Sequence, residues 1–237
     1  MLNILFEDQS IIVAEKPAGL ESQATRKLEP DMVSEIRNYI HKLSTDGRGK
    51  TREPYVGVIH RLDKPVGGIM VYARTREAAA SLSRQVREGR MDKYYLSIVC
   101  GKPVDNVGNF VDYLLKDEKS NYSRVVDKGA EGSREARLEY RLLSSGELDG
   151  REVSLVEIHL LTGRHHQIRV QFASRGLPLL GDEKYEDGNL ANRRPGRFRR
   201  EPLALYAWRL EFDHPVTGER MKFERRPDTG AFRRYGE

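Results

Sequence analysis

Residues 60–75 read HRLDKPVGGIMVYART, and this stretch decides how the chain is interpreted. A Lys-Pro step and a Gly-Gly pair predict a tight turn, and the apolar run 69–72 predicts a buried strand after it. Asp63 lies in this turn between two basic residues, Arg61 and Lys64. A carboxylate fixed on a turn beside a strand can act as a nucleophile or a general base. The alternative for an Asp seen alone is that it caps the backbone of the turn.

Hydrophobic patterns on both sides of this stretch predict the neighbouring elements. Two apolar runs, 4–6 and 11–14, predict an opening hairpin, and helical spacing over 31–43 predicts a helix. Thr75 is suited to cap a second helix that ends near Glu88, with Gly89 as its stop. The sequence also predicts a helical segment after Thr162-Gly163 within 161–175, and strands near 94–99, 110–115, 123–127, 135–143, 152–161, 203–212 and 220–224.

Many strands with about three helices predict an α+β fold rather than a doubly wound one. We expect a mixed, largely antiparallel central sheet flanked by helices and loops, with a catalytic cleft across the sheet. Residues 1–237 are expected to form one catalytic domain, built as two lobes that share the sheet.

Charge is concentrated in one part of the chain. Lys and Arg number 41 against 36 Asp and Glu, which gives a formal net charge of +5. Within 189–200 an interleaved aromatic, Phe198, accompanies five arginines: Arg193, Arg194, Arg197, Arg199 and Arg200. Such a run fits an RNA phosphate backbone. The alternative is a solvated surface loop.

The cysteine count and the hydropathy pattern indicate the cellular compartment. Cys100 is the only cysteine, so no internal disulfide can form and a reducing compartment is expected. No apolar run approaches membrane-spanning length. A strand pattern begins at Asn3, which leaves no room for a signal peptide before it. We therefore expect a cytoplasmic protein that contacts no membrane. No cluster of Cys and His suggests a metal site.

Three further segments carry chemically distinctive residues: Lys16-Pro17-Ala18-Gly19-Leu20, Lys93-Tyr94-Tyr95, and LTGRHHQIRV at 161–170. Together with residues 60–63, these motifs resemble those of the RluA-type family of RNA pseudouridine synthases. The resemblance extends from Ile4 to about Glu219 and includes Gly181-Asp182 and the 214–218 turn. Four ordered motifs at family-like spacing are far more specific than any one of them.

The resemblance implies an enzyme that isomerises uridine in RNA to pseudouridine. The reaction breaks the bond from ribose to the ring nitrogen, turns the base and rejoins it through carbon 5, without cofactor or metal. Asp63 is implied to be the nucleophilic or proton-abstracting carboxylate, which must be ionised. A nearby cation keeps its pKa low, and the family's motif places that cation at Arg164.

Further positions match the family's substrate contacts. Tyr95 offers a flat ring to the base and a hydroxyl near carbon 5. The alternative role for Tyr95 is packing in the core. Tyr94, its neighbour in the strand, should point to the opposite face. If Arg164 opens a helix, Ile168 shares its face and packs against the uracil. Arg61 is implied to hold the target nucleotide out of its stack, or else forms a phosphate or structural ion-pair contact. His60, in the same motif, is assigned with it to substrate binding.

The chain also departs from the family pattern. Glu21-Ser22-Gln23 replaces the usual apolar-then-His continuation, and Val66-Gly67 replaces a Thr-Ser or similar pair. His165 lies where the family varies, whereas His166 matches a structural position. Because adjacent side chains diverge on a helix, the two histidines are a poor metal pair. We expect no separate N-terminal RNA-binding module of the kind that many relatives carry, so that the domain and its basic loop recognise RNA themselves, as a monomer. The substrate can be ribosomal or transfer RNA.

Two rival functions remain at this point. One is a catalytically idle RNA-binding module, although an idle copy has no need to retain Asp63, Tyr95 and Arg164 together. The other is an acid-base hydrolase built on Asp63 and a histidine, for which the sequence supplies no clear partner. Isomerisation conserves the mass of the RNA and hydrolysis does not, so mass distinguishes them.

Overall fold

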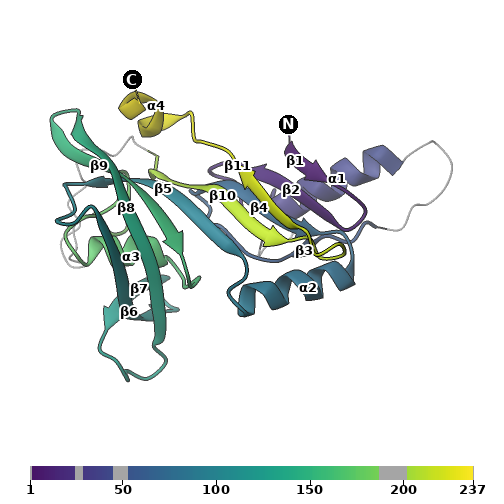
Figure 1. The fold of residues 1–237 in the computed structure, drawn as a ribbon, viewed down its shortest axis with the longest axis horizontal. Helices are drawn as coiled ribbons and strands as arrows, with labels where there is room; N and C mark the ends of the chain where they lie inside the picture. Colours follow the sequence, from purple (N-terminus) through teal and green to yellow (C-terminus); the bar gives the residue numbers. More distant parts are fainter. Residues whose placement is uncertain (1, 25–28, 45–52, 187–201, 237) are drawn as a thin grey trace. The chain divides into compact units, whose positions relative to one another are not determined.

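The computed structural model describes residues 2–24, 29–44, 53–186 and 202–236. The chain divides into two compact units, each of which uses distant parts of the sequence (Figure 1). The first unit comprises Met1–Asp92 and Ala207–Arg225, and the second comprises Lys93–Tyr206 and Arg226–Glu237.

The first unit is a sheet with two helices. Its elements are β1 (Asn3–Glu7), β2 (Ile11–Lys16), α1 (Met32–Ser44), β3 (Gly57–Val58), β4 (Gly67–Ala73), α2 (Arg76–Arg87), most of β10 (Leu205–Asp213), and β11 (Arg220–Glu224). The strand order is β1-β2-β4-β10, with β3 beside β4 and β11 beside β10. The pairs β1–β2, β2–β4, β3–β4 and β10–β11 are antiparallel.

Strand β4 is central to this unit because all seven of its residues are buried. Ile69 and Val71 pack with Leu82 of α2 in one apolar cluster. Helix α2 begins where its sequence predicts, since the Thr75 side chain accepts a hydrogen bond from the Ala78 amide at 3.1 Å. The second glycine of the Gly-Gly pair is required sterically: a Cβ on Gly68 would lie 2.3 Å from the Ala207 carbonyl oxygen of β10.

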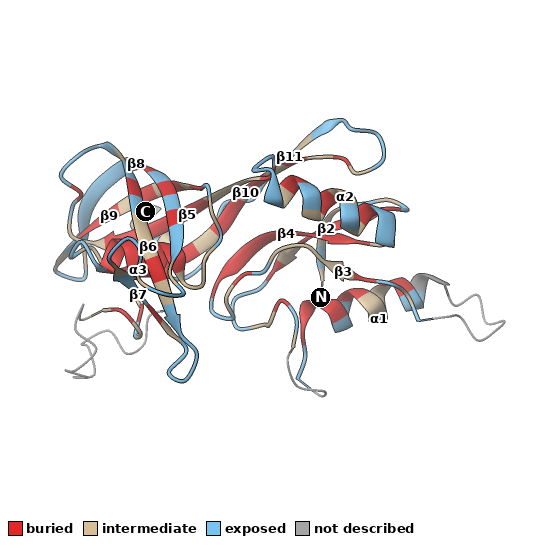
Figure 2. Cartoon of the chain, turned by 90° about the horizontal axis from the view of Figure 1, so that it is seen from below, coloured by how far each residue is buried: buried red, intermediate tan, exposed pale blue. Residues whose placement is uncertain are grey.

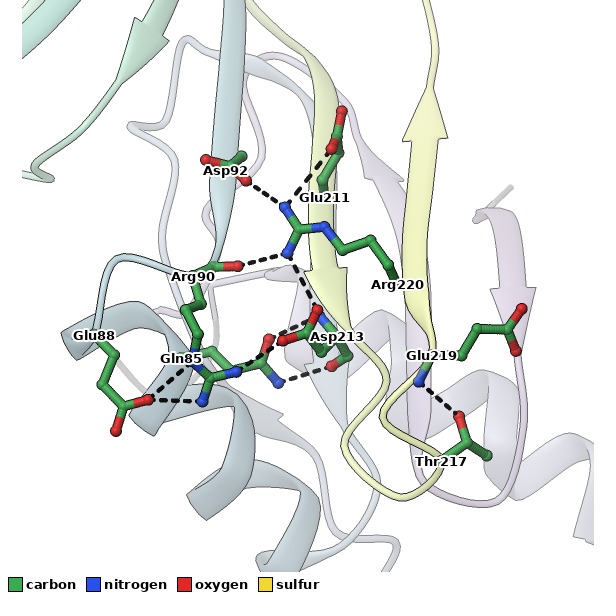
Figure 3. A network of polar contacts seen from close by, with 9 residues as sticks. All are labelled: Gln85, Glu88, Arg90, Asp92, Glu211, Asp213, Thr217, Glu219 and Arg220. Carbon is green, nitrogen blue, oxygen red and sulfur yellow. Dashed lines mark hydrogen bonds and ion pairs between the residues drawn. The ribbon is translucent and has the colours of Figure 1, made fainter.

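An arginine network joins the β10–β11 hairpin to the turn after α2 (Figure 3). Arg220 pairs with Asp92 and with Asp213, the latter at 3.3 Å, and donates to the Arg90 carbonyl at 2.7 Å. Arg90 in turn pairs with Asp213 at 2.7 Å and with Glu88 at 2.6 Å. Exposed ion pairs are individually weak, but a shared network fixes geometry. These arginines therefore have a structural role in fixing the start of the next strand.

The second unit is a longer antiparallel sheet. It contains β5 (Asp92–Cys100), β6 (Val107–Asp117), β7 (Tyr122–Val126), β8 (Arg134–Leu148), β9 (Arg151–Leu160), α3 (Gln167–Ala173) and α4 (Gly230–Gly236). The order is β5-β9-β8-β6-β7, and every pair in it is antiparallel. Exposed and buried residues alternate along residues 135–141 of β8, so one face of this part of the sheet is covered, whereas the rest of the strand has no buried residue (Figure 2).

Helix α3 supplies the core of this unit. All seven of its residues are buried (Figure 2). Val170 and Ala173 pack against Leu114, Ala136 and Tyr185. The short helix α4 contributes Ala231 to a second cluster with Ile98 and Val153.

The predicted α+β fold with a largely antiparallel sheet is confirmed, as are the opening hairpin and both early helices. Three details differ. Strands β8 and β9 extend to a two-residue turn at Asp149-Gly150, where both residues have positive φ angles of 51° and 75°; the Asp-Gly pair is a hairpin signal that favours this turn. Strand β3 and helix α4 were not predicted. Helix α3 begins later than predicted, for a reason given below. Among the described residues, no helix has both the length and the apolar character needed to span a membrane.

Candidate active site

The turn that carries Asp63, residues 61–66, is here called the Asp63 turn. A hydrogen bond from the Val66 amide to the Asp63 carbonyl, at 2.9 Å, closes the second half of this turn. Asp63 is half-buried and Arg61 is exposed. Because β4 follows directly, the turn is attached to a strand that is buried along its whole length. The local geometry predicted for this stretch, a turn followed by a buried strand, is confirmed.

A buried lysine holds the Asp63 turn from the side. Lys16, at the end of β2, has 0% exposure. Its ammonium group donates to the carbonyls of Pro17 at 3.0 Å, Leu20 at 2.6 Å and Lys64 at 3.2 Å. The Gly19 amide donates to the same Lys64 carbonyl at 2.8 Å. The Lys-Pro-Ala-Gly-Leu segment is thus fastened to the residue that follows Asp63.

Burial lowers the pKa of Lys16 from 10.5 to about 8, while the carboxylates of Glu21 and Asp63 act in the opposite direction. At neutral pH the ammonium group therefore stays protonated. A cation this close favours the ionised form of the Asp63 carboxylate. This effect was predicted for Arg164, and no role was predicted for Lys16. A lysine that follows an apolar run and directly precedes a proline was the available signal.

His60 lies just before the Asp63 turn. Its Nε2 atom accepts a hydrogen bond from the Val71 amide of β4 at 3.3 Å. β3 pairs with Ala73 and Tyr72 of β4, and the His60 side chain bonds to the next residue along β4, Val71, where the pairing with β3 has ended. His60 therefore has a structural contact, and its assignment to substrate binding stays a prediction.

The two tyrosines of β5 point to opposite faces, as predicted. Tyr94 stacks on His159 of β9, with ring centroids 4.4 Å apart and planes at 11°. Tyr95 pairs in register with Ile158 and is 6% exposed. Since successive side chains alternate along a strand, Tyr95 lies on the face opposite the Tyr94–His159 stack.

Residues 161–166, here called the Arg164 segment, are held by one buried amide. The Gln167 side-chain oxygen accepts from the Arg164 amide at 3.0 Å and from the Thr162 hydroxyl at 2.8 Å. Its nitrogen donates to the Arg137 carbonyl at 3.0 Å. The Arg164 guanidinium is itself oriented by a bond from Nε to the Glu135 carbonyl at 2.8 Å.

Helix α3 does not open at Arg164, which corrects the sequence analysis. His166 adopts a left-handed backbone conformation with φ of 52°, and the helix begins only at Gln167. Arg164 and Ile168 therefore do not share one helical face. Ile168 lies within α3 and is buried. A further consequence is that His165 and His166 do not diverge but stack, with centroids 3.7 Å apart.

The stacked histidines are structural at neutral pH. His165 bonds through Nδ1 to the Ser123 hydroxyl and His166 through Nδ1 to the Tyr185 hydroxyl, both at 2.8 Å. Burial, assisted by nearby cations, lowers the pKa of His165 to about 4 and that of His166 to about 2. Both rings are therefore neutral above the acid range.

A buried ion pair that the sequence analysis missed lies beside them. Arg169 of α3 binds the Asp182 carboxylate through two nitrogens, at 2.7 and 2.6 Å, and Asp182 is 1% exposed. The Arg169 guanidinium also lies 5.2 Å from the centre of the Tyr185 ring. The Gly181-Asp182 pair was noticed in the sequence but given no role; its role is to anchor α3.

Ser10, Asp8 and His214 form a group that superficially resembles a hydrolytic triad. Asp8 and Ser10 both contact the same ring nitrogen, Nε2, at 2.9 and 3.3 Å. The other nitrogen, Nδ1, accepts from the Thr217 amide at 3.1 Å. A working triad needs base and nucleophile on opposite ring nitrogens. This group therefore ties the 214–218 turn to the β1–β2 turn and does not support the rival hydrolase.

The proposed site residues are distributed over both units. His60, Arg61 and Asp63 belong to the first unit, and Tyr95, Arg164 and Ile168 belong to the second. The pairing of Asp63 with Arg164 stays a prediction. The arginine run at 193, 194, 197, 199 and 200 lies outside the described residues. Within the described ranges, no group of three or more His, Cys, Asp and Glu side chains is placed to hold a metal ion.

Comparisons with known proteins identify the family. The sequence pattern described as RNA pseudouridylate synthase matches residues 10–174. An uncharacterized RNA pseudouridine synthase of Aquifex aeolicus is 36% identical over 94% of this chain and 68% of its own length. The ribosomal large subunit pseudouridine synthase D of Nitrosomonas europaea is 34% identical, over 94% of this chain and 61% of that protein. This chain thus spans only about two thirds of the length of these relatives.

Solved structures agree. Human RNA pseudouridylate synthase domain containing 4 is 26% identical, with a TM-score of 0.72 over 94% of this chain and 88% of the other. Human RNA pseudouridylate synthase domain containing 1 shares the fold at 20% identity, with a TM-score of 0.74 over 96% of this chain and 84% of the other. The family pattern covers well over half of the chain and includes the Asp63 turn and the Arg164 segment. The chain therefore belongs to the RNA pseudouridylate synthase family, as its resemblance to the RluA-type enzymes predicted.

Proposed function

We propose that this chain isomerises specific uridines of ribosomal RNA to pseudouridine, with Asp63 as the catalytic carboxylate. The observation that carries the proposal is the fastening of the Asp63 turn. A half-exposed surface aspartate needs no buried ammonium group beside it, whereas a reacting carboxylate benefits from a fixed position and a nearby cation. Ribosomal rather than transfer RNA is favoured because several relatives are named for the large ribosomal subunit.

In the proposed reaction, Asp63 acts in its ionised form, either by attacking the nucleotide or by removing a proton from it. Arg164 supplies a second counter-charge. Tyr95 and Ile168 hold the base flat, and the Tyr95 hydroxyl lies near the proton lost from carbon 5. Arg61 and His60 keep the nucleotide out of its stack, which costs a few kcal/mol. The five arginines of 193–200 bind the phosphate backbone.

The test is to incubate the purified protein separately with unmodified large-subunit ribosomal RNA, small-subunit ribosomal RNA and transfer RNA. Nucleosides from complete digests are then separated by chromatography, and their masses are measured by mass spectrometry. We expect pseudouridine to appear among the nucleosides of large-subunit RNA, in an amount equivalent to a few residues per RNA molecule, with no free uracil and no change in RNA mass. Conversion confined to transfer RNA would overturn the substrate class. RNA that is bound but chemically unaltered would favour the idle binding module.

A further inference from the structure

A buried serine contacts the peptide group beside Asp63. Ser22 is 2% exposed. Its hydroxyl donates to the Leu62 carbonyl at 2.8 Å and accepts from the Leu62 amide at 3.0 Å. Leu62 is itself buried. Among the described residues, no other partner for these two backbone groups of Leu62 is found.

The position of this contact along the chain matters. The Leu62 carbonyl belongs to the peptide plane that joins Leu62 to Asp63, so its orientation sets the direction of the Asp63 side chain. On the other side, the Lys64 carbonyl is held by Lys16 and Gly19. The backbone is therefore fixed both before and after Asp63, and Ser22 supplies the fixed point before it.

Ser22 is itself anchored. The Met32 amide donates to the carbonyl of the preceding residue, Glu21, at 2.9 Å. The Asp31 carboxylate accepts from the Ala24 amide at 2.6 Å and caps α1 by accepting from the Ser34 amide at 2.7 Å. Ser22 is thus fixed to the start of a helix, and a fixed donor can orient a backbone group, whereas a mobile one cannot.

We propose that Ser22 is a positioning residue for the Asp63 carboxylate. This inference rests on the proposed function, since it assigns Ser22 a part in the same reaction. Removal of the hydroxyl leaves the Leu62 amide and carbonyl buried without a partner, and the peptide plane before Asp63 is released. A displacement of about 1 Å at a reacting group can cost about 100-fold in rate. RNA binding, which depends on surfaces elsewhere, is unaffected.

The decisive experiment compares Ser22→Thr with Ser22→Val. Both side chains add one methyl group to serine, so the steric cost of that group is common to both, and Ser22→Ala, which adds no atom, controls for the second methyl group of valine. Only threonine keeps the hydroxyl. We expect Ser22→Val to lose about 10- to 100-fold in kcat relative to Ser22→Thr, with KM for RNA within about twofold. Equal kcat values for the two variants would overturn the proposal.

A matched control separates positioning from simple loss of stability. Ser154 is also fully buried, and its hydroxyl donates to the Gly101 carbonyl at 2.8 Å in the second unit. Ser154→Ala and Ser22→Ala should lower Tm comparably, but only Ser22→Ala should lower kcat. If both lower kcat equally at temperatures where both are folded, Ser22 acts only through stability and the proposal fails.

Amide hydrogen exchange gives a readout that does not depend on activity. In Ser22→Val, the Leu62 amide should exchange faster than in Ser22→Thr, while the amides of β4 keep their protection. Unchanged exchange at Leu62 would overturn the proposed restraint even if the enzyme is active. If the wild-type protein converts no uridine in any RNA, the proposed function is what fails, and the Leu62 exchange rate still decides whether Ser22 holds the Asp63 turn.

Discussion

The Asp63 turn and the Arg164 segment present their functional residues in different ways. The Asp63 turn is held by a buried charge: Lys16, 48 positions away from Lys64 in sequence, donates three hydrogen bonds to carbonyls. The Arg164 segment is held by a neutral amide, Gln167, only three residues from Arg164. The first arrangement depends on the protonation of a lysine, and the second depends on two histidines that stay neutral.

This difference indicates that the two regions respond to opposite ends of the pH range. The pKa of Lys16 lies near 8, and those of His165 and His166 lie near 4 and 2. Between about pH 5.5 and pH 7, neither region should change its protonation much, because His165 is already neutral there and Lys16 is still mostly protonated. Variants that change residues of the Asp63 turn and of the Arg164 segment one at a time can therefore show whether each region acts independently.

Asp63→Asn should have the largest effect. The amide keeps the shape of the side chain but lacks the charge that the chemistry needs, so turnover should fall at least about 1,000-fold, or about 4 kcal/mol in the barrier. Single-turnover rates at saturating RNA measure this loss, with RNA affinity and Tm as controls. Residual turnover within about tenfold of wild type would contradict the assignment of Asp63 as nucleophile or base.

Lys16→Met should be the most damaging change to stability. It removes the ammonium donor from three carbonyls, of which only that of Lys64 keeps the Gly19 amide, and we expect a loss of about 3 kcal/mol in the free energy of unfolding at pH 7. The wild-type protein should gain stability as pH rises from about 8 to 10.5, because in that window the unfolded chain retains a proton that the folded chain has lost. Denaturant unfolding across this range measures the slope. Lys16→Met should lack that slope; if it retains the slope, another group titrates.

Arg164→Met should lower turnover about 100-fold if its cation assists Asp63, with part of the loss recovered at higher pH, because a carboxylate without its counter-charge titrates higher. The pH profile of kcat is the measurement. Lys16 remains in this variant as a cation that interacts with Asp63, so a loss without pH recovery would mean that Arg164 is not the counter-charge of Asp63.

Tyr95→Phe should retain base stacking but slow product formation by about tenfold, since the hydroxyl near carbon 5 is lost. Tyr94→Phe is the matched control, because its ring lies against His159 on the other face. Single-turnover assays of both variants would reveal the difference. A larger defect in Tyr94→Phe would place the substrate on the opposite face of β5.

His165→Gln should have the smallest effect. The unfolded chain takes up a proton near pH 6.5, whereas folded His165 does so only near pH 4, so stability should fall as pH drops through this window. Glutamine removes the titration, and we expect a gain on the order of 1 kcal/mol at pH 5 relative to wild type, with no difference at pH 7.5. Unfolding curves at both pH values test this. An equal change at both would mean that packing, and not protonation, dominates at this site.

Much of the molecule could be predicted from sequence alone because its signals are local. The strand of residues 69–72, the cap at Thr75 and the turn at Lys64-Pro65 each depend on neighbours within a few positions. The same holds for the opposite faces of Tyr94 and Tyr95, which follow from the pleat of a strand. The family motifs then pointed to Asp63, Tyr95 and Arg164 as a set.

Tertiary structure alone decided what holds these residues. The partner of the Leu62 peptide is Ser22, 40 positions away, and Asp182 forms an ion pair with Arg169 only because the fold brings α3 to the 179–186 segment. The start of α3 was misplaced because His166 takes a left-handed conformation, which is uncommon for residues other than glycine and which no local pattern indicated. The burial of Lys16 likewise depends on tertiary contacts, because one of the carbonyls that accept from it, that of Lys64, is distant in sequence. Local sequence specifies backbone preference, but burial and long-range hydrogen bonds exist only once the chain has packed.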